Sequence, residues 1–275
     1  MEELYVINSL GEREIFSKRK IYTACRNAGL DDFSAQEIAD KIEKEAYPGI
    51  TTLKISQKIS GFLRKESLRS AMKFSLKRAM AKLGPAGFLF EKYVGEILAK
   101  NGYKIKLNQQ LIGFSKCVYE IDFLAEKDNL IYLGECKYHN KAGERVDLKI
   151  ALANHARFLD IQKNHPQSGK LRSILVTNTK FTSQAIRYSE CAGVNVLGWK
   201  YPEGRGLEIL IETKNLYPIT ILPSFKGYLA DVFAEKGIML ASDLIGISSG
   251  KLSRNLGINE KEIKNLTNEA RILLE

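Results

Sequence analysis

The stretch CVYEIDFLAEKDNLIYLGECKYHN, residues 117–140, decides the fold expected for this chain. Two runs rich in apolar residues flank the polar turn at 126–129. β-branched and aromatic residues on both sides of a short Asp/Asn turn are typical of a β-hairpin. The sequence therefore predicts two adjacent antiparallel strands here.

Charged residues interrupt both strands. Alternation of side chains places Asp122 on the face opposite Ile121 and Phe123, and it puts Glu135 and Lys137 together on one face of the second strand. A carboxylate that is buried in such a run without a partner costs several kcal/mol. We therefore expect these carboxylates to meet a metal ion, a cation or solvent at the strand end.

The motif suits metal-dependent hydrolysis of a phosphodiester. Asp122 is followed thirteen positions later by Glu135-Cys136-Lys137. Two carboxylates on neighbouring strands can hold a Mg²⁺ ion that keeps several waters and binds a phosphate. Lys137 points to the same side of the strand as Glu135 and can orient or activate the attacking water. The alternative is a solvated edge hairpin with charges placed by chance, because such residues are frequent.

Composition favours a polyanionic partner. The 275 residues suit two domains or three, and 42 Lys and Arg against 32 Asp and Glu give a net charge of +10. A surplus of this size favours nucleic acid as the partner. The alternative is a lysine-rich soluble protein whose charge serves solubility.

Several classes of protein are disfavoured. The four cysteines form no CxxC pair and only three histidines are present, so no zinc cluster is expected. A phosphate-binding GxxxxGK[ST] loop is absent, which argues against an ATPase motor. The sequence has neither a signal-peptide pattern nor an apolar run of membrane-spanning length. We expect a cytoplasmic protein with reduced thiols and no membrane partner.

Residues 1–83 are predicted to form the first domain. A hairpin is expected at 4–16, followed by helices at 19–28, 34–47 and 52–65. Ser34 with Glu37 three residues later is typical of a capping box at a helix start.

This domain resembles the ATP-cone, a small nucleotide-binding regulatory module. The resemblance is carried by Val6-Ile7, Gly11, Phe16, Lys20-Ile21 and Gly49-Ile50-Thr51-Thr52. It implies ATP or another adenine nucleotide as ligand, with Val6, Lys20 and Thr51 at the site. The basic run of the family is replaced here by Asn8-Ser9-Leu10-Gly11, which removes charge-assisted bonds to phosphate. The alternative is a helical interaction or dimerisation domain.

A basic helix is predicted at 65–83. Lys65, Arg69, Lys73 and Lys77 recur every four residues and share one face. Lys73 and Lys77 are candidate contacts to DNA phosphates, and the alternative is an ordinary solvated face.

Residues 84–224 are predicted to form the second domain, which starts at the Gly-Pro break after Leu83. A helix at 87–101 carries Glu91, and the expected order is helix, strand, strand, strand, helix, strand. Residues 84–212 resemble the Mrr-type restriction endonucleases. The resemblance is carried by Phe90-Glu91, Gly102-Tyr103, Ile121-Asp122, Glu135-Cys136-Lys137-Tyr138, the strand at 173–178 and the segments 181–185 and 194–199.

That resemblance implies the PD-(D/E)xK nuclease fold and assigns the site. Asp122 and Glu135 become ligands of Mg²⁺ or Mn²⁺, with the carbonyl of Cys136 as a third. Lys137 becomes the catalytic lysine, and Glu91 assists the metal site. The last core strand is expected at 194–199, and the apolar pattern predicts a further short strand at Leu207–Ile211.

Residues 225–275 are predicted to form three short helices and resemble a helix-hairpin-helix module. Glycines in its turns would let the backbone approach a phosphate, with Lys251 and Arg254 nearby. A protein-contact or dimerisation domain is the alternative.

Taken together, the sequence predicts an α/β chain with a restriction-endonuclease-like core between two helical domains. The leading hypothesis is a homodimeric, metal-dependent DNA endonuclease regulated by ATP. The alternatives are a nucleotide-responsive DNA-binding regulator without catalytic activity and an oligomeric scaffold.

Overall fold

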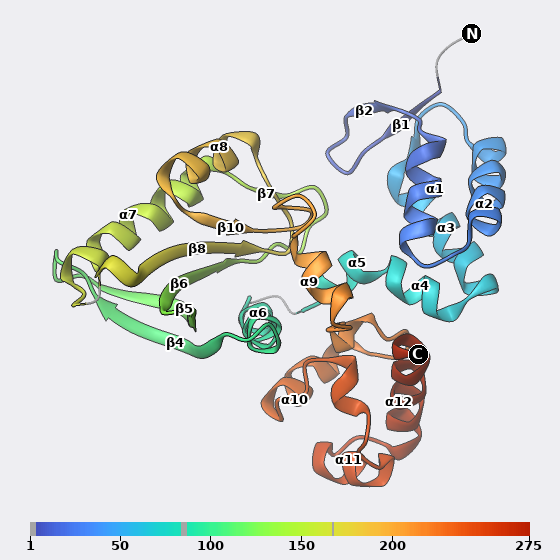
Figure 1. Ribbon diagram of the computed structural model, residues 1–275. Helices are drawn as coiled ribbons and strands as arrows, with labels where there is room; N and C mark the ends of the chain where they lie inside the picture. The colour runs from blue at the N-terminus through green and yellow to red at the C-terminus, as the bar shows by residue number, and fades with distance from the viewer. Residues whose placement is uncertain (1–3, 84–86, 167) are drawn as a thin grey trace. The chain divides into compact units, whose positions relative to one another are not determined.

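The chain is mixed α/β, with helices and several sheets (Figure 1). The computed structural model describes residues 4–83, 87–166 and 168–275. The described residues group into two compact units. One contains the residues up to Ala79, Ile221–Phe225 and Leu244–Glu275, and the other contains Met80–Thr220 and Lys226–Asp243. The three-domain division at 83/84 and 224/225 stays a prediction, and its first boundary borders residues 84–86, which lie outside the described residues.

The first unit begins with a small sheet. Strands β1 (Tyr5–Ile7) and β2 (Arg13–Ile15) pair antiparallel, and β3 (Ile50–Thr51) pairs parallel with β1. Gly11 lies in the connecting turn with φ +81°, a backbone conformation that glycine adopts without strain. The hairpin expected at 4–16 is confirmed.

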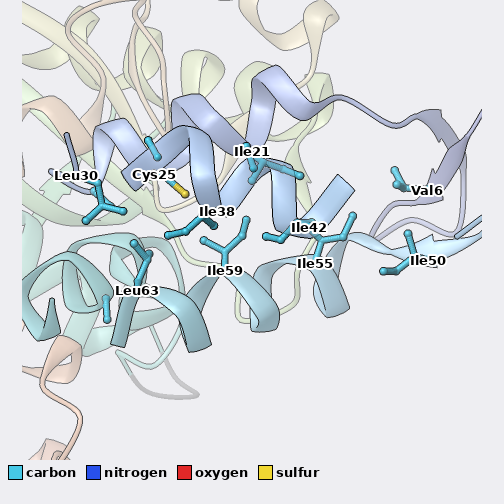
Figure 2. Packing of buried hydrophobic residues seen from close by; sticks show 14 residues of the cluster. Val6, Ile21, Cys25, Leu30, Ile38, Ile42, Ile50, Ile55, Ile59 and Leu63 are labelled. Atoms are coloured by element: carbon cyan, nitrogen blue, oxygen red, sulfur yellow. The ribbon is translucent and has the colours of Figure 1, made fainter. Parts of the chain in front are cut away.

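Three helices follow and enclose the core of this unit. They are α1 (Lys18–Asn27), α2 (Asp32–Glu45) and α3 (Thr52–Glu66), close to the predicted ranges. Figure 2 shows their apolar side chains packed with those of β1 and β3. The labelled residues are Val6, Ile21, Cys25, Leu30, Ile38, Ile42, Ile50, Ile55, Ile59 and Leu63.

The start of α2 differs from the prediction. The side chain of Asp31 accepts the N–H of Ser34 at 2.8 Å, so Asp31 is the N-cap. Ser34 therefore lies in the first turn, and the predicted capping box is wrong. Glu37 instead pairs with Lys41 one turn further along the helix.

The single basic helix predicted at 65–83 is also wrong. After α3 ends, Ser67 takes an extended conformation (φ −156°, ψ 118°) and caps α4 (Leu68–Phe74), its Oγ accepting the N–H of Ser70. A further short helix, α5, spans Leu76–Met80. An extended residue changes the helix direction, so Lys65 does not continue the stripe of basic residues in α4 and α5.

The C-terminal helices belong to the first unit. The 3₁₀ turn η4 (Ala241–Leu244) leads to α11 (Ser249–Leu256) and α12 (Glu260–Leu274), which packs against α4. Gly257 ends α11 with φ +66°. The predicted turns are present, but α12 has 15 residues and is not a short helix.

Arg69 ties α4 to the end of α12. Its Nε donates to the carbonyl oxygen of Leu273 at 3.2 Å, where the last helical carbonyls lack partners in the helix. Arg69 therefore has a structural contact, in place of the solvated position that the predicted stripe implied.

Replacing Arg69 by Met should lower the free energy of unfolding by about 1 kcal/mol, because a charged donor to a helix C-terminus is lost. Urea unfolding measures the change. Lys65→Met removes the same charge from an exposed position and serves as the control. Equal midpoints for the two variants would contradict the proposed contribution of this contact.

The second unit is built on a five-stranded sheet of order β10-β8-β6-β5-β4. Its strands are β4 (Lys104–Ile112), β5 (Val118–Lys127), β6 (Leu130–Lys137), β8 (Leu171–Thr177) and β10 (Asn195–Leu197). Three helices accompany it: α6 (Phe88–Lys100), α7 (Leu148–Asn164) and α8 (Ser183–Ala192). The predicted order from helix α6 to strand β8 is confirmed.

Shorter elements complete this unit. β7 (Arg145–Val146) and β9 (Lys180–Phe181) form a two-stranded sheet, and α10 spans Ala230–Glu235. The 3₁₀ turns are η1 (Ser168–Lys170), η2 (Ile219–Ile221), which runs on into the first unit, and η3 (Gly227–Leu229).

The strand predicted at Leu207–Ile211 is a helix, α9 (Leu207–Thr213). Leu207 and Ile211 are both buried and lie four residues apart, which is a helical period. Glu208 accepts the N–H of Lys200 at 2.7 Å, an anchor that a strand prediction could not foresee.

Candidate active site

The site lies where strands β5 and β6 part. Their ladder runs from Lys127↔Leu130 to Phe123↔Gly134 and ends there. Beyond this point β5 stays paired with β4, whereas β6 stays paired with β8 as far as Lys137↔Thr177. The two strands therefore open a wedge, and Asp122 and Glu135 are the first residues on its two sides.

Asp122 bridges this wedge. Its Oδ2 accepts the backbone N–H of Cys136 at 2.6 Å. Cys136 lies beyond the end of the β5–β6 ladder and has no backbone acceptor on β5. The Asp122 carboxylate accepts its N–H instead, because a buried backbone N–H needs an acceptor. This hydrogen bond fixes the position of Asp122 relative to the motif on β6.

The side-chain alternation of β5 breaks at Asp122. Ile121 belongs to the apolar cluster that contains Leu133. The ring of Phe123 lies where a Cβ of Gly134 would point. Successive residues of a strand point to opposite faces, so Phe123 lies on the other face from Leu133 and Ile121. The prediction that Ile121 and Phe123 share a face is therefore wrong. The opposing strand β4 has Asn108 with φ +52° between the partners of these two residues, so the hairpin is distorted on both strands.

Three carboxyl groups influence one another here. Glu91 lies in the first turn of α6, and burial raises its pKa, with a further increase from the charge of Glu135. Burial also raises the pKa of Asp122 to about 7; the N–H of Cys136 and Arg157 oppose this, and Glu135 and Glu91 add to it. Such a cluster favours a proton or a cation.

Arg157 contacts the candidate site and was not identified from the sequence. Its Nη1 donates to Glu135 Oε2 at 2.6 Å, and the two side chains form an ion pair. A signal was present, because Arg157 falls three residues after buried Asn154 and four before buried Ile161. An arginine on the buried stripe of an amphipathic helix needs a partner.

Lys137 ends strand β6 with an exposed side chain. Within the part of the chain that the structure describes, it makes no hydrogen bond or ion pair. Burial and the neighbouring carboxylates raise the pKa of the Cys136 thiol well above its ordinary value, so this thiol is neutral. The thiol is therefore a poor metal ligand, and the backbone of Cys136 is the part that can serve the site.

The loop after β6 is firmly anchored. The side-chain amide of Asn178 donates to the carbonyl oxygen of His139 at 2.7 Å and accepts its N–H at 2.9 Å. The imidazole of His139 contacts Glu144 and is only 13% exposed. His139 is therefore part of the packed loop, and His155 on α7 bonds to the hydroxyl of Tyr188.

The donors suit a hard divalent cation in kind. Asp122, Glu135 and the carbonyl of Cys136 are oxygen ligands, and Mg²⁺ or Mn²⁺ accepts two carboxylates when water and phosphate supply the rest. In the described ranges no three side chains of His, Cys, Asp or Glu are grouped to hold a metal. The fit therefore depends on two carboxylates and the backbone, and on releasing Glu135 from Arg157.

The raised pKa of Asp122 predicts how stability depends on pH in chelator. The folded state holds the proton up to about pH 7, whereas the unfolded state releases it near its ordinary value of 3.8. The free energy of unfolding should thus fall as pH rises from about 4 to 7. Asp122→Asn should remove this loss of stability. Its effect on the free energy of unfolding should be more favourable at pH 8 than at pH 4 by roughly 2 kcal/mol.

Urea unfolding at both pH values measures the difference. Asp128→Asn, in the exposed turn between β5 and β6, should change stability equally at the two pH values. A pH-independent effect of Asp122→Asn would show that folding does not raise the pKa of this carboxyl group.

The residues predicted for nucleotide binding lie in or beside the small sheet of the first unit. Val6 and Thr51 are on the paired strands β1 and β3, and Lys20 contacts Glu14 of β2 at 3.4 Å. The side chain of Val6 is buried in the core, so only its backbone is available. The hydroxyl of Thr51 caps α3 by accepting the N–H of Lys54.

The residues predicted for DNA binding lie on three elements of the first unit. Lys73 is in α4 and Lys77 is in α5. Lys251 and Arg254 are exposed and one turn apart on α11, and Arg254 Nε donates to the carbonyl oxygen of Gly250 at 3.2 Å. Their role in DNA binding stays a prediction.

None of the described helices has the length and apolar character needed to cross a bilayer.

Comparison with known sequences yields two matches. A family model described as AF1548-like, C-terminal, matches residues 217–274. A protein of Archaeoglobus fulgidus, named only as an uncharacterized protein, is 37% identical over 179 residues. The match covers 65% of this chain and 98% of that relative.

Comparison with solved structures gives a consistent result. The crystal structure of AF1548, a protein of unknown function, is 35% identical with a TM-score of 0.59, covering 67% of this chain and 96% of that one. VC1899 from Vibrio cholerae is 14% identical with a TM-score of 0.31, covering 72% and 49%. The MspJI restriction endonuclease in complex with a 27-mer oligonucleotide is 12% identical with a TM-score of 0.28, covering 92% and 55%. The last two TM-scores are too low to establish a common fold.

Proposed function

This chain belongs to the AF1548-like family, and from the geometry of its candidate site we propose that it is a metal-dependent DNA endonuclease. One observation carries the proposal. Asp122 and Glu135 are the first residues beyond the end of the β5–β6 ladder, one on each strand, and Lys137 stands exposed two residues after Glu135. Two carboxylates that can hold a metal ion, with an ammonium group nearby, suit metal-assisted hydrolysis of a phosphodiester.

Each side chain has a distinct part in this chemistry. Asp122 and Glu135 would hold Mg²⁺ or Mn²⁺, which supplies a Lewis acid for the phosphate and lowers the pKa of water. Lys137 orients the attacking water and offsets the charge of the phosphate. Glu91, whose raised pKa favours its protonated form at the edge of the cluster, supports the other carboxylates. In-line attack would leave 5′-phosphate and 3′-hydroxyl ends.

The element order supports the same proposal. Helix α6, strands β4 to β6, helix α7 and strand β8 follow the order of the restriction-endonuclease-like core. The Mrr-type assignment within that class is part of the proposal. Homodimerisation is proposed as well, because cutting both strands of a duplex takes two such sites.

The first unit is proposed to regulate the nuclease and to help it hold DNA. Its small sheet and helices match the elements expected of an ATP-cone-like domain, and α4, α5 and α11 carry the basic residues. The net charge of +10 supports a polyanionic partner. ATP, or another adenine nucleotide, is the proposed ligand of the cone-like domain.

A cleavage assay tests the proposal. Supercoiled plasmid, linear duplex and single-stranded DNA are incubated with Mg²⁺, Mn²⁺ or EDTA, each with and without ATP. Cutting in the presence of metal and none in EDTA is expected. Cutting that persists in EDTA would contradict the assigned chemistry, and an equal rate with and without ATP would contradict nucleotide regulation.

A second candidate is a DNA-binding regulator that does not cut. It is favoured by one observation, the ion pair that holds Glu135 to Arg157 at 2.6 Å. If that ion pair persists when Mg²⁺ or Mn²⁺ is present, only one of the two carboxylates that the metal needs is free to bind it. DNA binding in gel-shift experiments, without cutting under every condition above, would select this candidate.

A further inference from the structure

Arg157 stands between the acidic cluster and solvent. Besides its bond to Glu135 Oε2, its Nη2 reaches Glu135 Oε1 at 3.5 Å, and its Nη1 also donates to the main-chain oxygen of Glu120 at 3.2 Å. The side chains of Arg157 and Glu135 are only 25% and 24% exposed. Solvent therefore screens the pair weakly, and removal of either partner leaves an uncompensated charge.

The guanidinium and a divalent cation compete for the same atoms. Both carboxylate oxygens of Glu135 already face Arg157. Asp122 lies beside this pair, since its Oδ2 accepts the N–H of Cys136, the residue that follows Glu135. A cation that coordinates Glu135 through either oxygen must weaken or replace the contact with Arg157.

We propose, on the basis of the nuclease function above, that Arg157 is the internal counter-ion of the acidic cluster and that a divalent cation binds by displacing it from Glu135. Arg157 is then a positioning residue. It holds the Glu135 carboxylate in place while the metal is absent, and it lowers the affinity of the site for metal.

The surroundings determine where the displaced guanidinium goes. On its inner side a cavity of about 10 Å³, also lined by Glu135 and Asn154, has room for about one water molecule. On its outer side lies an open groove, lined by Val118, Tyr119, Glu120, Ala153, Ala156 and Arg157. Of these two spaces the groove is the one with room for a guanidinium group, so Arg157 moves outward and exposes its charge beside the reaction centre.

Calorimetric titration with Mn²⁺ in the absence of DNA tests the proposal on the full chain. Arg157→Met should bind Mn²⁺ about tenfold more tightly than wild type, because the competing cation is gone. Arg157→Lys, which keeps one charge but loses the two-pronged contact, should fall between them. Lys149→Met removes a charge from an exposed position of the same helix and should change the affinity less than about twofold.

Thermal unfolding gives a second readout. Arg157→Met should lower the melting temperature in EDTA, and saturating Mn²⁺ should raise it more in this variant than in wild type. An arginine with only a structural role would misplace Glu135 when removed and weaken metal binding. Unchanged or weaker Mn²⁺ binding by Arg157→Met therefore overturns the proposal, and Arg157→Lys decides in the same way if the methionine variant does not fold.

The outcomes separate this inference from the proposed function. Wild-type protein that is folded but binds no Mn²⁺ overturns both. Tighter Mn²⁺ binding by Arg157→Met, combined with no cleavage of any DNA, supports the counter-ion role and overturns the nuclease. Cleavage by wild type with unchanged metal affinity in the variant overturns the counter-ion role alone.

Discussion

Asp122→Asn should reduce the rate of DNA cleavage at least about 10³-fold, a loss of about 4 kcal/mol of transition-state stabilisation. The amide keeps the size of the side chain, and its oxygen can still accept the N–H of Cys136. What it loses is the negative charge that would hold the metal. The wedge should therefore keep its shape, and DNA binding should change little.

Single-turnover cleavage and DNA binding in Ca²⁺ measure the two effects separately. Glu126→Gln removes a carboxylate from an exposed position of the same strand and should cut at the wild-type rate. Lys137→Ala should also be strongly impaired while it binds metal normally, because its ammonium group acts on water and phosphate. Wild-type cleavage by Asp122→Asn would refute the assignment of the site.

Gly134→Ala should destabilise the second unit by about 3 kcal/mol. A Cβ at this position would overlap three ring atoms of Phe123, and that ring is fully buried and cannot move aside. Gly134 also forms the last pair of the β5–β6 ladder, next to Asp122. A shift of the ring should therefore disturb the active site as well, and cleavage should fall together with stability.

The double variant with Phe123→Leu separates overlap from other causes. A smaller side chain leaves room for the methyl group, so the double variant should be more stable than the sum of the single effects predicts. Gly169→Ala, where a Cβ meets no atom within 4 Å, is the control and should change stability little. Strict additivity in the double variant would rule out the clash with Phe123.

Much of the fold was predictable from local patterns. The hairpin at β5 and β6, the preceding helix α6 and the strand β8 all follow from periodicity and turn residues, which depend only on neighbours in the chain. The placement of Asp122 and Glu135 on adjacent strands follows from the same patterns, because a short turn sets the pairing register.

Errors arose where a distant segment overrode a local pattern. The basic stripe predicted at 65–83 is interrupted at Ser67, and Arg69 bonds to the end of α12 more than 200 residues away. The apolar residues at Leu207–Ile211 suit a strand or a helix equally well over so short a run, and burial at Leu207 and Ile211 favoured the helix.

By itself the sequence determined which residues are candidates for the proposed chemistry, since the spacing of Asp122, Glu135 and Lys137 is fixed along two strands. Only the tertiary structure decided their electrostatic state. The pKa of Asp122 near 7 and the pairing of Glu135 with Arg157 arise where α6, β5, β6 and α7 exclude solvent together. Coulomb energy depends on distance through space and on the surrounding solvent, and sequence separation specifies neither.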